Sequence, residues 1–246
     1  MNPLSNLSVK IFADGADRAG MLELARHPLV KGFTTNPTLM RKAGVTDYEA
    51  FARQVIADLP DRPLSLEVFS DDFDEMEEQA LRIASWGDNV YVKVPVTNTR
   101  GESSVPLVAA LARSGVKLNV TAVFTLRQVH EVCQALRGRA PAVVSVFAGR
   151  IADAGVDPVP LMMAAREIVR TCPNAELLWA SPREVWNIFQ ADAAGCDIIT
   201  VANDLLKKLD SVGKDLEQFS LETVQMFRAD AVKAGYSLGG RRRKAA

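Results

Sequence analysis

The sequence predicts an α/β fold, a single-domain (β/α)8 barrel, from three observations. Eight short apolar or β-branched runs recur along the 246 residues. Their centres lie roughly 20 to 33 residues apart, the length of a strand plus a crossover helix. No linker or low-complexity segment divides the chain, and about 250 residues is a common length for such a barrel. A closed barrel is therefore favoured over an open doubly wound sheet.

Each apolar run is expected to form one strand. Parallel strands that are covered by helices show nearly continuous apolar sequence, because both of their faces are buried. The runs are rich in valine, isoleucine and leucine, which suit a pleated and buried surface. The expected strands are residues 9–13, 32–35, 64–69, 90–96, 118–124, 142–148, 176–180 and 198–201.

Segments between the strands have apolar residues at helical spacing. Thr125 followed by Gln128 is typical of a capping box. Ser181 followed by Pro182 predicts an N-cap with proline at the first helical position. Asp157 precedes another proline-initiated segment. The expected helices include residues 71–85, 125–136, 158–171, 181–194 and 220–234, the last of them outside the sheet.

Composition excludes several classes of function. The net charge of −1 gives no electrostatic case for binding nucleic acid or a membrane surface. The two histidines, His27 and His130, both stand in helix-like context, so a histidine-based catalytic triad or a zinc site is not expected. Cys133, Cys172 and Cys196 lack metal-binding spacing, and their odd, low number suits a reducing compartment. No Gly-x-Gly-x-x-Gly or Walker motif follows the first strand. We expect a cytoplasmic protein without metal or cofactor.

The sequence also allows predictions for the two ends of the chain. Residues 1–10 lack a basic region followed by a long apolar run, so no signal peptide is expected, and no apolar stretch approaches 20 residues. The basic run at 241–244 follows two glycines and reads as a solvated tail. We expect residues 1–238 to hold the barrel and its C-terminal helix, and residues 239–246 to be a disordered basic tail.

One lysine stands inside an apolar strand, in the run Val90-Tyr91-Val92-Lys93-Val94-Pro95-Val96. Burial of an ammonium group is costly, so such a lysine tends to lose its proton and becomes able to attack a carbonyl, giving a Schiff base. Two structural interpretations compete with this one. The lysine could form a buried ion pair, or its stem could lie along the wall with the ammonium group in water. The strand alone does not separate these possibilities.

Polar residues also stand at the ends of most of the other predicted strands, where a (β/α)8 barrel places its chemistry. Each of them has an ordinary explanation as a turn, cap, strand or surface residue. Together they would be aimed at one central cavity. They are Asp14, Asn36, Glu67, Asn119, Thr121, Ser145, Arg150, Ser181 and Arg183.

These residues carry a resemblance that runs from Phe12 to about Leu238. The chain resembles the transaldolase family, in its short form that also includes fructose-6-phosphate aldolases. Several motifs occur in the family's order. They are Thr34-Thr35-Asn36-Pro37-Thr38, Val92-Lys93-Val94-Pro95, Asn119-Val120-Thr121-Ala122-Val123-Phe124, Ser145-Val146-Phe147-Ala148-Gly149-Arg150-Ile151 and Gly195-Cys196-Asp197-Ile198-Ile199-Thr200.

The resemblance implies a role for each matching residue. Lys93 would be the Schiff-base lysine and Asp14 the acid/base carboxylate. Glu67 and Thr121 would hold the water that shuttles protons as the imine forms and hydrolyses. The substrate would be a sugar phosphate, and no metal or cofactor is implied. Substrate hydroxyls would meet Asn36, Asn119 and Ser145, with Thr34 and Phe147 beside them, and the phosphate would meet Arg150, Ser181 and Arg183.

The resemblance also separates activities within the family. Glu67 and Phe147 are similar to transaldolases, whereas the direct aldolases carry Gln and Tyr there. Transfer of a dihydroxyacetone unit from fructose 6-phosphate or sedoheptulose 7-phosphate is therefore favoured over simple cleavage, in the pentose phosphate pathway. Three features depart from the family pattern: Gly15, Val146 and the loop at 181–186. They leave open that the substrate is a different ketose, such as one with a sulfonate in place of phosphate.

Three other functions remain as alternatives. The first is a direct aldolase that uses Lys93 in the same way. The second is a barrel that binds a sugar phosphate without turnover, and the third is a phosphosugar isomerase with Glu67 as its base. The resemblance further implies a homo-oligomer, since short family members often form rings. The helix at 220–234 could dock on a neighbour or cover its own barrel.

Overall fold

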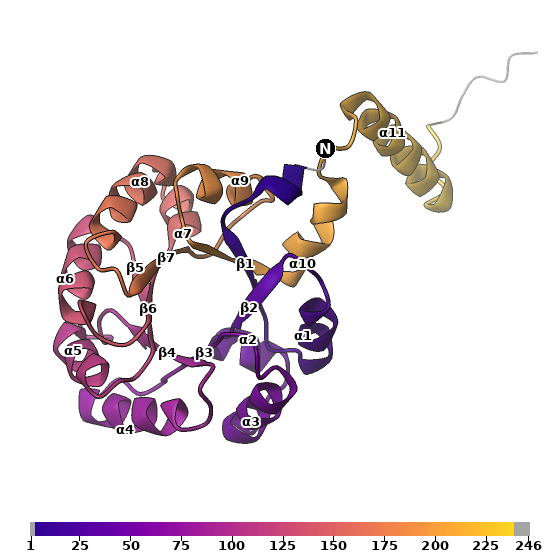
Figure 1. Ribbon diagram of the computed structural model, residues 1–246. Coiled ribbons are helices and arrows are strands. Elements are labelled where there is room, and N and C mark those ends of the chain that lie inside the picture. The colour runs from indigo at the N-terminus through magenta and orange to yellow at the C-terminus, as the bar shows by residue number, and fades with distance from the viewer. Residues whose placement is uncertain (1–2, 239–246) are drawn as a thin grey trace, which may run out of the picture. The chain divides into compact units, whose positions relative to one another are not determined.

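The structure is a computed structural model that describes residues 3–238. Eight parallel strands close into a barrel in chain order, with β1 paired to β8 (Figure 1). This confirms the predicted (β/α)8 fold and all eight predicted strands, with small shifts at their ends. The strands are β1 (Lys10–Asp14), β2 (Val30–Thr34), β3 (Leu64–Glu67), β4 (Val90–Pro95), β5 (Leu118–Val123), β6 (Ala142–Val146), β7 (Ala175–Trp179) and β8 (Ile198–Ala202).

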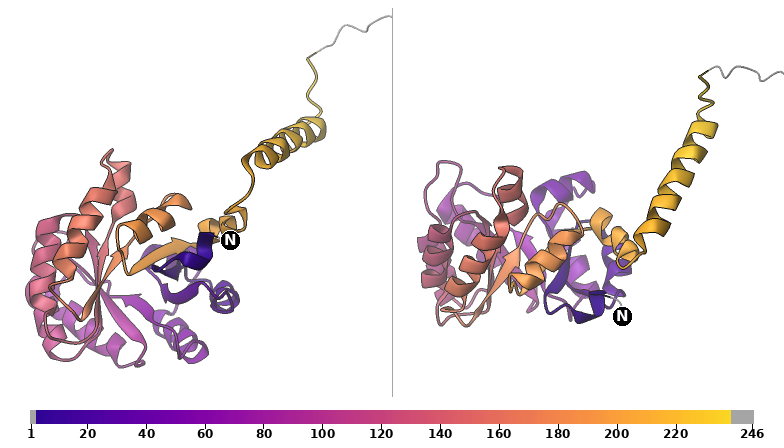
Figure 2. Two further views of the ribbon diagram at one scale, coloured as in Figure 1. Left: turned by 45° about the horizontal axis from the view of Figure 1, so that its top comes forward. Right: turned by 90° about the horizontal axis from the view of Figure 1, so that it is seen from above.

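Helices surround the strands on the outside of the barrel, as Figures 1 and 2 show. The capping box at Thr125 and Gln128 is present, which confirms that prediction. The helices are α1 (Arg18–Ala25), α2 (Pro37–Lys42), α3 (Tyr48–Asp58), α4 (Phe73–Ala84), α5 (Val105–Arg113), α6 (Leu126–Leu136), α7 (Ala148–Asp153), α8 (Pro158–Val169), α9 (Trp186–Ala193), α10 (Asn203–Leu206) and α11 (Leu216–Lys233), with 3-10 turns at η1 (Pro3–Asn6) and η2 (Lys207–Ser211).

One predicted helix start is wrong. Ser181 does not cap a helix, because α9 begins at Trp186 with Val185 as its N-cap. Ser181 instead has a left-handed backbone with φ of 62°. The N–H groups of Arg183 and Glu184 both donate to the side-chain oxygen of Asn187. The Ser-Pro sequence therefore forms a loop after β7 that the start of α9 holds in place.

The chain divides into two compact units. Residues Leu7–Leu209 form the barrel, and residues 3–6 with 210–238 form a smaller second unit. In that second unit, α11 begins four residues before the predicted start because Asp215 caps it, and none of its residues is buried. The predicted basic tail at 239–246 lies outside the described residues. Between residues 3 and 238 no helix has the length and hydropathy needed to cross a membrane.

An apolar layer fills the interior of the barrel below its C-terminal end. Phe12, Val143 and Ile198 belong to one buried cluster that also holds Leu178 and Ala180. Side chains two residues apart on a strand point to the same face. The interior positions that follow these three residues are Asp14, Ser145 and Thr200. A polar layer therefore lies directly above the apolar one, at the end of the barrel where chemistry is expected.

The loop after β7 approaches α7 so closely that only glycine fits between them. A Cβ atom on Gly149 would lie 1.5 Å from the carbonyl oxygen of Ser181. The Gly149 N–H also donates to the carbonyl oxygen of Ala180 at 3.2 Å. This contact joins the end of β7 to the segment that carries Arg150.

We predict that Gly149→Ala destabilises the protein by about 1–3 kcal/mol, because the added methyl group must displace main chain rather than a side chain. Urea unfolding measures the change. Gly15→Ala is the matched control, since its Cβ would make only ordinary contact, at 3.6 Å from Asn203. Equal stability of the two variants would contradict this account of the contact.

Candidate active site

A polar cavity of about 120 Å³ opens at the C-terminal ends of the strands. It brings together nearly all of the residues predicted from the sequence, although they are spread over more than 160 positions of the chain. Glu67 reaches the same place through its contact with Lys93. The lining residues are Asp14, Thr34, Asn36, Lys93, Asn119, Thr121, Ser145, Phe147, Arg150, Ala180, Ser181 and Thr200.

Lys93 lies in the wall of this cavity and is only 7% exposed. Its Nζ donates to the backbone carbonyl oxygen of Thr35 at 2.8 Å and lies 2.9 Å from Glu67 Oε2. Register places Glu67 and Lys93 side by side on β3 and β4. The ammonium group is therefore not in bulk water, which removes one of the two structural interpretations. A buried ion pair is present, and it leaves Lys93 facing the cavity.

Asp14 ends β1 and faces the same cavity. Thr34 Oγ1 donates to Asp14 Oδ1 at 2.7 Å. Burial raises the pKa of the Asp14 carboxyl above its ordinary value of 3.8, although the positive charge of Lys93 and the Thr34 hydrogen bond oppose this shift. The negative charge of Glu67 adds to the increase. A carboxyl group that holds its proton more tightly than usual suits proton exchange with a substrate.

Thr121 lies beside an irregularity in β5. The register between β5 and β6 shifts between Val120 and Val123, and Ala122 has φ of 58°. Left-handed backbone costs a non-glycine residue about 1–2 kcal/mol, so the surrounding sheet must hold this conformation. Thr121 is 2% exposed and lines the cavity. Thr121 stands two residues after Asn119 in regular register with β4, so strand alternation places it in the wall that also holds Lys93, and the left-handed Ala122 follows it directly.

Hydrogen bonds fix the orientation of the Asn119 side chain. Ser145 Oγ donates to Asn119 Oδ1 at 2.7 Å, and Asn119 Nδ2 donates to Ser65 Oγ at 3.0 Å. Asn36 is the N-cap of α2, and its Oδ1 accepts from the Leu39 N–H at 3.0 Å. The amide nitrogen is therefore the donor that Asn36 can offer to a ligand.

The two predicted phosphate-binding arginines differ in position. Arg150 lines the cavity, and its Cζ lies 5.4 Å from the ring centroid of Phe147. Arg183 is not among the lining residues. Its Nε donates to Asp153 Oδ1 at 2.9 Å and its Nη2 pairs with Asp153 Oδ2. The structure thus brings Arg150 and Ser181 to the cavity, and it leaves Arg183 engaged outside it.

Sequence reasoning assigned no role to two hydroxyl residues of this region, Ser65 and Thr200. Ser65 is 2% exposed and accepts the hydrogen bond from Asn119. Thr200 lines the cavity and contacts Thr34 through the two hydroxyl groups. A signal for both existed, because each stands two residues from another interior position of its own strand. A serine or threonine in an apolar strand is nevertheless common, so the pattern alone did not single them out.

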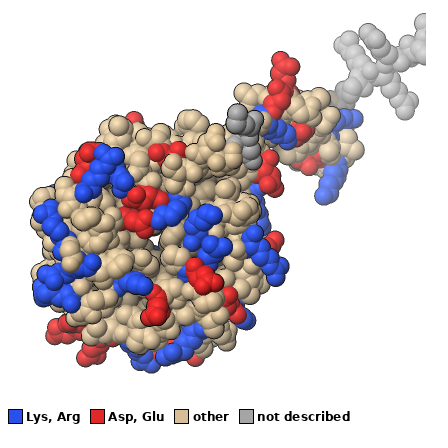
Figure 3. Space-filling model, viewed as in Figure 1, with Lys and Arg blue, Asp and Glu red and all other residues tan. Residues whose placement is uncertain are grey.

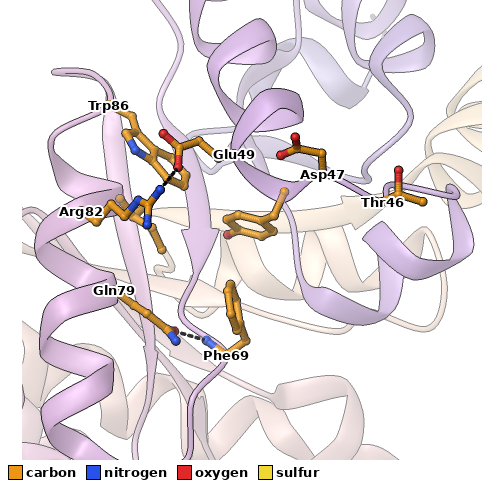
Figure 4. Close-up of a pocket in the computed structure, with 9 residues that line it drawn as sticks. Thr46, Asp47, Glu49, Phe69, Gln79, Arg82 and Trp86 are labelled. Carbon is orange, nitrogen blue, oxygen red and sulfur yellow. Dashed lines mark hydrogen bonds and ion pairs between the residues drawn. The ribbon is translucent and has the colours of Figure 1, made fainter.

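A larger groove of about 570 Å³ lies elsewhere on the barrel, beside α3 and α4 (Figure 4). Phe69 and Trp86 line it together with the ion pair between Glu49 and Arg82. None of the predicted site residues contributes to its lining. Tyr48 connects this groove to the strand that carries Glu67, because its hydroxyl donates to the carbonyl oxygen of Glu67 at 2.8 Å. The volume of a pocket alone therefore does not identify the candidate active site.

The charges around the barrel have both signs. On the face drawn in Figure 3, basic and acidic side chains are interspersed without a large area of one sign. Among residues 3–238, no group of three or more His, Cys, Asp or Glu side chains has the arrangement of a metal site. The polar cavity holds charged groups of both signs as well, since Asp14, Lys93 and Arg150 line it and Glu67 contacts Lys93.

Comparison with known proteins gives matches over most of the chain. The family model described as Transaldolase/Fructose-6-phosphate aldolase matches residues 11–238. A probable transaldolase of Dehalococcoides mccartyi is 34% identical over 205 residues, which cover 82% of this chain and 90% of that protein. A probable transaldolase of Streptococcus pyogenes serotype M5 is 35% identical over 202 residues, with the same shares covered.

We predict that Asp14→Asn is more stable than the natural protein at pH 7. The raised pKa of Asp14 means that the folded state binds this proton more tightly than the unfolded state does. The contribution of Asp14 to the stability of the natural protein therefore falls as pH rises from about 4 through the raised pKa, because the buried carboxyl must ionise. Asparagine has no charge to bury. The stability gap between the two proteins should close as pH falls below the ordinary aspartate pKa.

Urea unfolding of both proteins between about pH 3 and pH 7 measures this gap, and the difference isolates Asp14 from other titrating groups. An Asp14→Asn variant that is less stable at pH 7, by an amount independent of pH, would show that burial of this charge carries no cost.

Proposed function

This chain belongs to the transaldolase/fructose-6-phosphate aldolase family, and from that premise we propose that it is a class I transaldolase. It transfers a dihydroxyacetone unit from fructose 6-phosphate or sedoheptulose 7-phosphate to an aldose phosphate through a Schiff base on Lys93. The observation that carries the proposal is the position of Lys93, which is 7% exposed in the wall of a polar cavity and lies 2.9 Å from Glu67.

The first step is formation of the Schiff base. Glu67 is the carboxylate in contact with the Lys93 ammonium and accepts its proton. The neutral amine attacks the C2 carbonyl of the ketose, and loss of one water molecule gives the iminium ion. Thr121 and Glu67 hold that water and return it when the imine is later hydrolysed. The buried ion pair of the free protein is in this way the resting form of the nucleophile and its base.

Bond cleavage follows from the iminium ion. Asp14 takes the proton of the C4 hydroxyl group, the C3–C4 bond breaks, and its electron pair flows toward the iminium nitrogen. The aldose phosphate leaves and a neutral enamine stays on Lys93. The raised pKa of Asp14 suits this step, because the carboxyl must hold the proton until an acceptor arrives.

Transfer reverses these events with a new aldehyde. Carbon C3 of the enamine attacks the acceptor, Asp14 returns its proton to the new hydroxyl group, and water releases the product ketose from Lys93. The oriented amide of Asn119 and the amide nitrogen of Asn36 would meet hydroxyl groups of the three-carbon unit. A direct aldolase would protonate the enamine instead, so the dependence of turnover on an acceptor separates the two activities.

Arg150 supplies the anion-binding group of the proposed site. Its guanidinium fork can donate to two of the three terminal oxygens of a phosphate or of a sulfonate. Arg183 would first have to leave Asp153, with which it is paired at two atoms. We therefore assign the primary contact with the anion to Arg150 and a smaller contribution to Arg183.

We predict that borohydride reduction in the presence of fructose 6-phosphate leaves a three-carbon adduct on Lys93. Intact mass and peptide mapping detect it. Erythrose 4-phosphate added before the reductant should discharge the enamine and remove the adduct. Lys93→Met should form no adduct and lose at least about a thousandfold in transfer rate, because no other residue supplies the nucleophile.

Three results would contradict the proposal. A folded protein that binds the ketose without an adduct on Lys93 would exclude the Schiff-base mechanism. Substantial proton exchange by Lys93→Met would favour an isomerase that uses Glu67 as its base. Rapid release of dihydroxyacetone without any acceptor would favour the direct aldolase.

We predict that Arg150→Gln raises KM for fructose 6-phosphate by about 10- to 100-fold, because one charge-assisted contact is lost. Arg183→Gln is the matched control and should raise KM less than about threefold, since its fork is already used by Asp153. Steady-state kinetics with a fixed acceptor measures both. A larger effect at Arg183 would mean that the loop after β7 rearranges on binding.

A further inference from the structure

We propose that Thr200 on β8 is a positioning residue for Asp14, which it holds through Thr34 in a chain of hydroxyl groups. The inference rests on the proposed function of Asp14 as the base for the C4 hydroxyl group. It adds a role for the last strand of the barrel, on which the reaction scheme above places no residue.

The chain of hydroxyl groups consists of two hydrogen bonds that connect three strands. Thr34 Oγ1 on β2 lies 2.7 Å from Asp14 Oδ1 on β1, and it is in hydrogen-bond contact with Thr200 Oγ1 on β8. Strand β1 lies between the other two in the barrel. Thr34 is 2% exposed and Thr200 is 7% exposed. Burial limits competition from bulk water, so these hydroxyl groups depend on one another.

The direction of each hydrogen bond follows from the number of protons. An ionised carboxylate only accepts hydrogen bonds, so the single hydroxyl proton of Thr34 goes to Asp14. The oxygen of Thr34 must then accept from Thr200. Thr200 therefore donates to Thr34, and Thr34 donates to Asp14. A donor behind Thr34 polarises its O–H group and strengthens its bond to the carboxylate.

The same chain of hydroxyl groups also holds Asp14 when its carboxyl group is protonated. When the carboxyl group has taken the C4 proton on Oδ2, its Oδ1 remains an acceptor, so Thr34 still donates to Asp14 and Thr200 still donates to Thr34. No hydrogen bond of this series reverses, and no heavy atom needs to move. Either protonation state of Asp14 thus finds a partner at the same position, which keeps the carboxyl aimed at the substrate between cleavage and transfer.

The charged groups that face Asp14 come from other strands. Lys93 on β4 lowers the pKa of Asp14 and Glu67 on β3 raises it, while Thr34 on β2 lowers it through its hydrogen bond. On β8, Thr200 contacts Thr34 through its hydroxyl group, which carries no charge. Its removal leaves the charges around Asp14 unchanged, and so it tests the hydrogen-bond chain by itself.

The test compares Thr200→Val with Thr200→Ser. Valine keeps the shape and removes the hydroxyl, and it leaves Thr34 with its donor still satisfied by Asp14, so the fold is retained. We expect kcat for transfer to fall by about tenfold or more through loss of alignment, with KM changed less than about twofold. The acid limb of the kcat profile should move upward by about 0.1–0.6 pH unit. Thr200→Ser should restore most of the rate.

Borohydride trapping identifies the step that is affected. Reduction before cleavage leaves a six-carbon adduct on Lys93, and reduction after cleavage leaves a three-carbon adduct. In Thr200→Val the share of six-carbon adduct should rise, because Schiff-base formation does not need Asp14 in this scheme but cleavage does. Ile199→Val is the matched control. It removes one methylene group from the adjacent residue of β8, whose side chain points to the opposite face, and it should leave the ratio unchanged.

The outcomes separate this inference from the proposed function. A natural protein that forms no adduct on Lys93 overturns the proposed function and this role with it. A normal adduct in the natural protein, together with unchanged kcat, pH profile and adduct ratio in folded Thr200→Val, overturns the role of Thr200 alone. A rate loss in Thr200→Ser as large as that in Thr200→Val would show that packing, not the hydroxyl, is responsible.

Discussion

The contact between the Lys93 ammonium group and the Glu67 carboxylate is the interaction on which the rest of the site depends. The two groups lie 2.9 Å apart in a wall that excludes most water. A buried pair of this kind adds little net stability, because desolvation of both charges offsets their attraction, whereas loss of one partner costs about 3–5 kcal/mol. In the proposed mechanism its value is chemical, because it keeps the amine of Lys93 and its base together, out of solvent and facing a cavity.

The barrel makes this arrangement possible by stacking two layers of side chains. Phe12, Val143 and Ile198 close the interior with an apolar layer. The next interior position on each of those strands is polar, so the cavity has a dry base and a hydrogen-bonding wall. Constrained backbone borders that wall at two places, at the left-handed Ala122 beside Thr121 and at Gly149 against the Ser181 loop. The polar wall thus combines regular strands with a few positions where the backbone is constrained.

Much of this was predictable from the sequence, for physical reasons that can be named. Strand spacing predicts the barrel, and a lysine within a valine-rich strand stands out because its burial is costly. What the sequence could not supply is the partner of each polar group. Arg183 follows β7 as expected, but Asp153 occupies its guanidinium group. The Ser181-Pro182 sequence suits a helix start, but a tertiary contact forces Ser181 into a left-handed loop. Thr200 looked like an ordinary strand residue, because a hydroxyl gains its role only from what it contacts across strands.

The central claim is that Lys93 bonds covalently to C2 of a ketose while Asp14 faces the hydroxyl group that must lose its proton. The most direct test is a crystal structure of the protein trapped with fructose 6-phosphate. The account predicts continuous density between Lys93 Nζ and C2, with Asp14 within hydrogen-bond distance of the C4 oxygen and Arg150 on the phosphate. A ketose bound in the cavity without a bond to Lys93, with the lysine still paired to Glu67, would contradict it.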